Sequence, residues 1–162
     1  MIGRFLKKRQ KCAPGDVFLV SLADGTFTAA QVLAFEPHAL NSAVCAFTLD
    51  RRGRDKPHDF DPAGVVSVQF VTRDLLDSGD WLVVGRASLE HGLGRNELAK
   101  QRANQFVGTS VVGSANMIIF LNACFALAPW DSFFDPLYCD KLLLSPDMKP
   151  CLVATKSERP NI

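Results

Sequence analysis

The longest apolar run of the chain, residues 117–128, sets the strongest limit on its fold. The run is too short to span a bilayer and contains Asn122, so membrane insertion is not expected. Ser114 precedes the run as a candidate N-cap, and Pro129 follows it as a helix stop. Because the segment is apolar on every side through Leu127, we predict a helix buried all round.

The N-terminal half carries the alternating apolar and polar residues that are typical of β-strands. A hairpin is predicted over residues 17–35, with its turn at Asp24 and Gly25. Thr72 is a plausible N-cap and Gly79 a plausible stop for a short helical turn between them. The remaining predictions for this half are strands at 43–49, 65–71 and 81–85 and a charged loop at 50–64.

The C-terminal half has a helical rather than an alternating pattern. Residues 96–106 predict a helix with a thin apolar face, residues 109–112 a strand, and residues 135–143 a short final helix. Strands come first and helices later, so we predict an α+β fold: a curved antiparallel sheet from the N-terminal half with helices packed from the C-terminal half. The expected organisation is a polar lead-in at 1–13, one domain at 14–150 and a loose tail at 151–162.

Composition and charge narrow the class of protein further. At 162 residues and 48% apolar content the chain can bury a substantial core. A formal net charge of +1 favours neither nucleic acid nor an anionic membrane as a partner. The five cysteines are irregularly spaced and form no CxxC pair, which argues against a disulfide framework or a zinc knuckle and fits a reducing cytoplasm.

Three segments together resemble the immunity protein 26 family, and the resemblance covers roughly residues 15–150. The first is Gly15-Asp16-Val17-Phe18 with Asp24-Gly25 and Gln31-Val32-Leu33; the second is Ser78-Gly79-Asp80-Trp81 with Val84-Gly85; the third is Phe120-Leu121-Asn122-Ala123, Pro129-Trp130-Asp131, Asp135-Pro136-Leu137-Tyr138 and Asp140-Lys141-Leu142-Leu143. The third segment is the most specific of them.

The resemblance implies two different functions. Most members of the family are regarded as cytoplasmic immunity proteins, which bind and neutralise a cognate polymorphic toxin. A small enzyme that resembles the same family hydrolyses organophosphate triesters and is close to this chain in size. The resemblance therefore predicts a phosphotriesterase acting on small organophosphates, with a toxin-binding immunity protein as the alternative.

Hydrolysis of a phosphotriester needs an activated water or nucleophile and positive charge near the phosphoryl oxygen. The candidate catalytic residues are His58, His91 and Asp131. His58 and Asp61 are the candidate ligands of a divalent metal, because they lie in the densest His/Asp cluster of the chain. The sequence has no HxH or HExxH motif, and a solvated loop is the alternative for this cluster.

An apolar substrate pocket is predicted around Trp130, Phe133, Phe134 and Tyr138, with Asp131 as a base at its edge. The alternative is that Trp130 packs against the sheet while Asp131 brackets the next helix. For a toxin-binding protein, the same Phe133 and Phe134 are candidate contacts.

A thiolate at Cys139 is a second route to hydrolysis, and the alternative there is a buried, inert thiol. No Gly-x-Ser-x-Gly elbow is present, so a serine hydrolase is not predicted.

Overall fold

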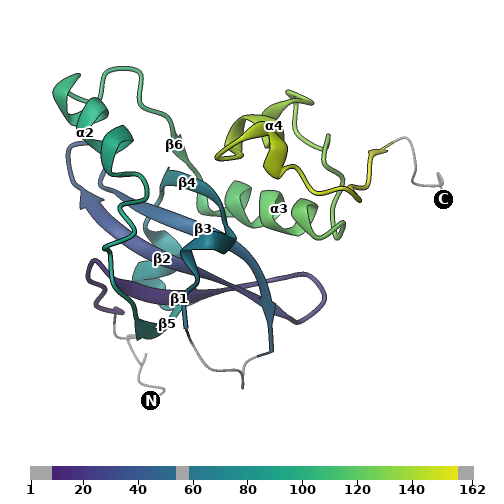
Figure 1. The fold of residues 1–162 in the computed structure, drawn as a ribbon, viewed down its shortest axis with the longest axis horizontal. Coiled ribbons are helices and arrows are strands. Elements are labelled where there is room, and N and C mark those ends of the chain that lie inside the picture. Colours follow the sequence, from purple (N-terminus) through teal and green to yellow (C-terminus); the bar gives the residue numbers. More distant parts are fainter. Residues whose placement is uncertain (1–8, 54–58, 157–162) are drawn as a thin grey trace, which may run out of the picture.

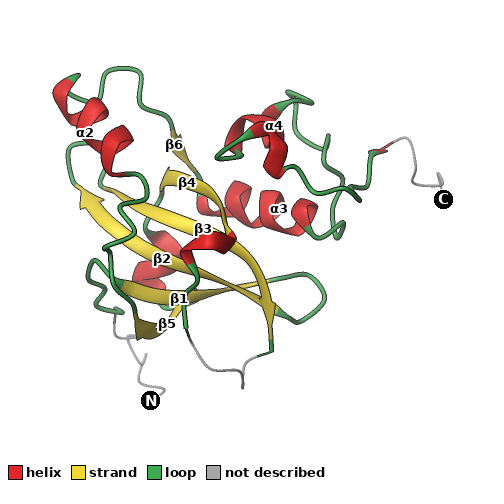
Figure 2. Cartoon of the chain, in the orientation of Figure 1, coloured by secondary structure: helices red, strands yellow, loops and turns green. Residues whose placement is uncertain are grey.

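The computed structural model describes residues 9–53 and 59–156. This part of the chain forms a six-stranded sheet in the order β5-β1-β2-β3-β4-β6 (Figures 1 and 2). The predicted α+β class is confirmed. The strands of the N-terminal half, from β5 to β4, are antiparallel as predicted, and β6 from the C-terminal half adds to the sheet parallel to β4. The strands are β1 (Asp16–Ser21), β2 (Phe27–Glu36), β3 (Ser42–Arg52), β4 (Val65–Val71), β5 (Leu82–Arg86) and β6 (Val111–Val112).

The helices lie on opposite faces of this sheet. On one face α3 packs with the C-terminal segment, and on the other face α2 covers the ends of β2, β3 and β4 (Figure 1). Among the described residues, no helix is both long enough and apolar enough to cross a membrane. The helices are α1 (Asp74–Ser78), α2 (Arg95–Ala103), α3 (Ser114–Cys124) and α4 (Tyr138–Leu142), with 3-10 turns η1 (Pro62–Gly64) and η2 (Pro146–Met148).

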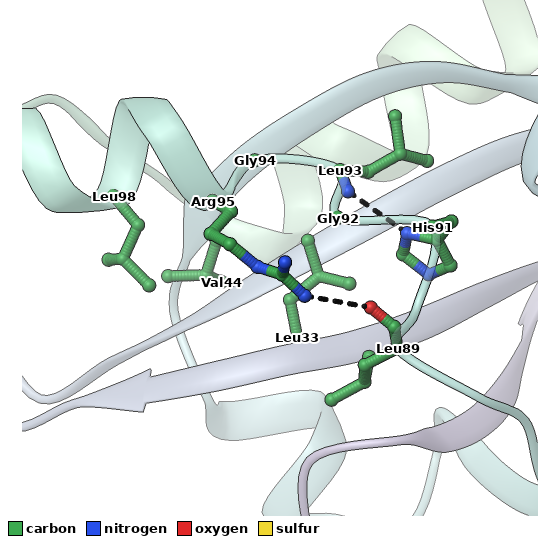
Figure 3. Close-up of a pocket in the computed structure, with 9 residues that line it drawn as sticks. All are labelled: Leu33, Val44, Leu89, His91, Gly92, Leu93, Gly94, Arg95 and Leu98. Carbon is green, nitrogen blue, oxygen red and sulfur yellow. Dashed lines mark hydrogen bonds between the residues drawn. The ribbon is translucent and has the colours of Figure 1, made fainter.

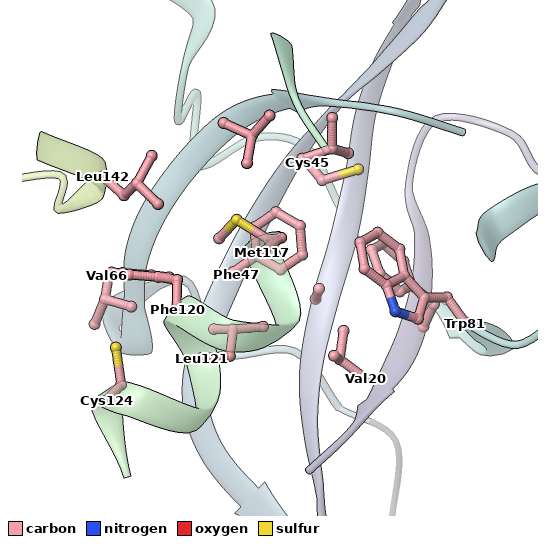
Figure 4. Packing of buried hydrophobic residues seen from close by; sticks show 14 of the residues in the cluster. Val20, Cys45, Phe47, Val66, Trp81, Met117, Phe120, Leu121, Cys124 and Leu142 are labelled. Atoms are coloured by element: carbon pink, nitrogen blue, oxygen red, sulfur yellow. The ribbon is translucent and has the colours of Figure 1, made fainter. Parts of the chain in front are cut away.

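The predicted buried helix is α3, and it forms the centre of the main core (Figure 4). Met117, Phe120 and Leu121 are fully buried, together with Phe47 of β3 and Trp81 at the start of β5. The sheet and the C-terminal segment cover most of the helix, but Ala115, Asn116 and Ile119 are exposed, so the prediction of a helix buried all round was wrong on that side. Burial of this much apolar area is the main source of folding free energy.

The ends of α3 differ from the prediction. Ser114 is the first residue of the helix and not its cap: its backbone N–H donates to Thr72 Oγ1 at 2.9 Å, and its hydroxyl donates to Asp74. The helix ends at Cys124 and does not continue to Leu127, because Ala126 takes a left-handed φ of 58°. The first backbone donor of α3 is therefore satisfied by Thr72, which lies just before α1 and is distant in sequence.

Asn122 is the single polar residue in the apolar run, and its hydrogen bonds explain its presence there. Its side chain is buried, its Oδ1 accepts from Ala23 N–H at 2.8 Å, and its Nδ2 donates to Ile118 O at 2.9 Å. The residue joins α3 to the turn of the β1–β2 hairpin. A buried amide with both groups bonded costs little free energy and fixes one packing arrangement.

The predicted loop at 50–64 begins later than expected, because β3 continues to Arg52. Arg52 lies opposite Phe27 of β2, and its guanidinium is only 5% exposed. It donates to Asp50 and forms an ion pair with Asp59 at 3.2 Å. This buried cation holds together the two ends of the segment that follows the strand.

Smaller boundary differences follow from capping. The short turn α1 ends at Gly79, which has a φ of 83°, as predicted. Thr72 is not its N-cap; Arg73 is, and the Thr72 hydroxyl donates to Asp74 at 2.7 Å. In the segment predicted as a loose tail, Ala154 pairs with Pro129 in an isolated bridge.

Candidate functional site

Trp130 lies in the main core and does not line an open pocket. Its side chain is 3% exposed, and its ring centroid is 5.9 Å from that of Phe120. The indole N–H donates to Asp140 Oδ2 at 3.2 Å, and Lys149 Nζ lies 5.4 Å from the ring centroid. These contacts match the packing alternative considered for this residue.

The three other predicted pocket residues do not converge with Trp130 on one cavity. Phe133 and Tyr138 are half-buried and pack against each other, with ring centroids 4.5 Å apart. Phe134 lies between them in sequence but its side chain is fully exposed. The predicted aromatic cluster is therefore divided into a packed pair and one ring in solvent.

Asp131 is held by the C-terminal segment. Its Oδ1 accepts from the backbone N–H of Lys156 at 2.9 Å, and the neighbouring Trp130 N–H donates to Ala154 O at 2.7 Å. Asp131 thus fixes a chain crossing next to the main core. Its partner is not the following helix, as the sequence predicted for a structural role, but residues 154–156.

His91 lies on the other face of the sheet, in the loop between β5 and α2 (Figure 3). Its Nδ1 accepts from the backbone N–H of Leu93 at 3.0 Å, and its Nε2 is 2.8 Å from Gln31 Oε1. Because Nδ1 must be the acceptor, Nε2 carries the proton and donates to Gln31. Burial, and then the positive charge of Arg95, lower the pKa of His91. Both ring nitrogens of a neutral imidazole are therefore engaged.

The predicted catalytic residues are not brought together. His91 and Asp131 belong to opposite faces of the sheet, and His58 lies outside the described residues. Phe60 does approach His91, with ring centroids 6.0 Å apart, so part of the predicted loop reaches the α2 face.

Asp61, the other predicted metal ligand, caps the turn η1 by accepting from Ala63 N–H at 3.0 Å. Within residues 9–53 and 59–156, no group of three or more His, Cys, Asp or Glu side chains is arranged to hold a metal ion.

The thiol of Cys139, the candidate nucleophile for hydrolysis, is not activated. Cys139 is fully buried, and burial, followed by the nearby charge of Asp140, raises the pKa of its thiol to about 12. Burial likewise raises the pKa of Cys124 to about 12. Thiols with such values are protonated at neutral pH and act as small core residues.

The α2 face contains two adjoining cavities that the sequence did not predict. The smaller, of about 130 Å³, lies beside His91 and Arg95 (Figure 3). The larger, of about 470 Å³, lies between α2, the edge of β4 and residues 143–144. Val44, Gly94 and Leu98 line both, so the two form one groove.

The larger cavity has an apolar floor and a polar wall. Val44, Val68 and Phe70 of the sheet and Leu98 of α2 provide apolar surface. The wall is a chain of hydrogen bonds in which Thr109 donates to Gln101 and Gln101 donates to Glu97 at 2.8 Å. A cavity that joins apolar surface to a few fixed polar groups is suited to a small molecule. The thin apolar face of 96–106 was the one sequence signal for it.

Comparison with family models, curated proteins and solved structures gave no match for this chain.

Proposed function

We propose that this chain acts by binding another protein, and that its partner is a cognate toxin, as the resemblance to immunity protein 26 proteins implies. The observation that carries the proposal is Phe134. Its ring is the most exposed large apolar side chain of the described residues, and Leu137, three residues further on, is also exposed. Aromatic residues in this position are typical anchors of protein–protein interfaces.

The backbone around Phe134 is held in place before any partner binds. Asp135 Oδ1 accepts from Leu137 N–H at 2.9 Å, and Asp135 forms an ion pair with Lys141 at 2.5 Å. The hydrogen bond from Lys141 lowers the pKa of Asp135. On the other side, Phe133 is fixed against Tyr138. A presentation that is already ordered reduces the entropy lost on binding.

The test is a calorimetric titration with the toxin encoded beside the gene for this chain. Phe134→Ala is expected to weaken binding by about 30-fold, which corresponds to about 2 kcal/mol for an interface anchor. Leu82→Ala on β5, another exposed apolar residue, is the matched control and should bind like the parent chain. Equal affinity of the parent and Phe134→Ala, or no adjacent toxin gene, would contradict the proposal.

The second candidate function is the phosphotriesterase. It is favoured by one observation: the imidazole of His91 faces an apolar cavity and is kept neutral by its surroundings. Turnover of a chromogenic phosphotriester, with and without a chelator, tests it directly. A hydrolase with its site in this cavity should lose turnover in His91→Ala variants that keep their fold, and His58→Ala tests the other predicted histidine. For either function we propose a cytoplasmic location, because the cysteine pattern suits a reducing compartment.

A further inference from the structure

The outer edge of β4 is covered at both ends but open in the middle. Leu144 N–H donates to Val66 O at 2.7 Å, and β6 pairs with Phe70 and Val71. The backbone groups of alternate residues point to opposite sides of a strand. Since Val66 and Phe70 point outward, away from β3, Val68 between them must point outward as well.

No strand reaches Val68 from outside. In the described part of the chain, its backbone N–H and C=O have no hydrogen-bond partner. A single residue of an otherwise covered sheet edge thus presents one donor and one acceptor side by side. Unpaired backbone groups that are partly removed from bulk water are costly, so such a position favours a partner.

The open position faces the larger cavity of the α2 face. Val68 and Phe70 line this cavity, with Ser110 from the segment before β6 and Leu144 from the segment that covers Val66. A full strand cannot continue along β4 here, because residues 144 and 110–112 occupy the same line on either side. The gap therefore suits a compact molecule and excludes an extended peptide.

We propose that this cavity binds a small, flat, uncharged compound that presents an adjacent N–H and C=O, such as a lactam or a pyrimidinone. The two groups would pair with the C=O and N–H of Val68, while the ring lies between Ser110 and Leu144, which line the cavity on either side of the open position. Glu97 is the only charged side chain among the described residues of the cavity wall, and its carboxylate disfavours anionic ligands. A volume of about 470 Å³ lies in the range of small-ligand sites. This inference does not depend on the toxin-binding proposal, which concerns Phe134.

The first test is amide hydrogen exchange on the ligand-free full chain. The Val68 amide should exchange faster than those of Ser67 and Gln69, because these point toward β3 and are bonded in the ladder. Protection of Val68 equal to that of Ser67 and Gln69 would mean that its N–H already has a partner, and would overturn the proposal.

The second test compares two isomeric probes by NMR titration of the labelled protein. In 2-pyridone the N–H and C=O are adjacent, whereas in 4-pyridone they lie at opposite ends of the same ring. The 2-isomer should shift the Val68 amide resonance, slow its exchange and bind at least about tenfold more tightly, equivalent to one hydrogen bond of about 1.4 kcal/mol. Equal binding of the isomers, or binding of neither, would overturn the proposal.

Two variants assign the preference to Val68 itself. Val68→Pro removes the outward N–H together with the valine side chain, and it should abolish the preference for 2-pyridone. Val68→Ala keeps the N–H and should retain the preference. A preference that persists in Val68→Pro would contradict the assignment. If Val68→Pro fails to fold, the exchange and isomer measurements on the parent chain still decide the question.

Discussion

The two faces of the sheet are built differently. On the α3 face, side chains from every strand of the sheet, from α3 and from the C-terminal segment form one continuous core, in which Phe18, Phe47 and Trp81 pack ring against ring. On the α2 face only Ala39, Val44 and Phe70 are buried in a small cluster. No residue of α2 is itself buried.

The difference shows that the stabilising core lies on the α3 face and that the space for a ligand lies on the α2 face. The apolar sequence of α3 allows it to be enclosed, so its face is filled by side chains. The polar sequence of α2 prevents close docking, and its half-buried Leu98 leaves the groove between helix and sheet unfilled. The main core and the cavity for a small ligand thereby lie on opposite faces, and each can be tested without the other.

The largest expected effect is on the α3 face. Phe120→Ala should lower the free energy of unfolding by about 3–5 kcal/mol, because it leaves a cavity in a fully buried site. Leu98→Ala, on α2, should cost less than about 1.5 kcal/mol, because its side chain already borders a cavity. Urea denaturation of both variants measures the comparison. Similar losses at the two positions would show that the faces contribute equally and would contradict it.

Gly94 tests how closely α2 approaches the sheet. It precedes the helix with a φ of 73°, and a Cβ there would lie 2.9 Å from Val68 Cγ1. Gly94→Ala should therefore cost about 1–2 kcal/mol through backbone strain and this contact. Hydrogen exchange should increase in α2 and not in α3. Gly25→Ala is the control: it has a similar φ of 82° but open space around it, so only the strain remains.

The other end of α2 is attached by an ion pair. Glu36 at the end of β2 is 5% exposed and accepts from Arg102 Nε at 2.7 Å. Arg102→Ala should cost about 1 kcal/mol, because it leaves a buried carboxylate with fewer donors. Lys100→Ala, on the same helix and exposed, is the control. If amide hydrogen exchange rises in α2 alone, the two faces are independent as described. If α3 exchanges faster as well, the independence of the two faces is contradicted.

The sequence predicted the α3 face better than the α2 face for a physical reason. Strong periodicity and a long apolar run are local signals, so the strands and α3 could be located from them. The end of α3 depended on Ala126 adopting a left-handed conformation, which residue type does not favour. The strand β6 is two residues long and pairs in parallel, and nothing local specifies either property.

The groove could not be predicted because it is the space left between segments that are distant in sequence. The open position at Val68 exists only because residues 144 and 111 stop on either side of it. Likewise Trp130 and Asp131 carried the strongest sequence pattern, yet they bond to Asp140 and Lys156 within the fold. The strongest motif of the sequence is thus explained by a specific chain crossing.

The smallest expected effect is a dependence of stability on pH, which we expect to arise on the α2 face and not on the α3 face. The pKa of His91 in the folded chain lies below its ordinary value of 6.5, so folding favours the neutral imidazole. Its contribution to stability is fully present above pH 6.5 and is lost as the pH falls below 6.5 through the folded pKa. Urea midpoints should decline over this interval in the parent chain more than in His91→Gln, which cannot titrate. The loss should be accompanied by faster exchange in α2, since protonation of Nδ1 removes the acceptor of the Leu93 N–H. An NMR titration that places the pKa of His91 at or above 6.5 would show that the loop before α2 does not hold the ring as described.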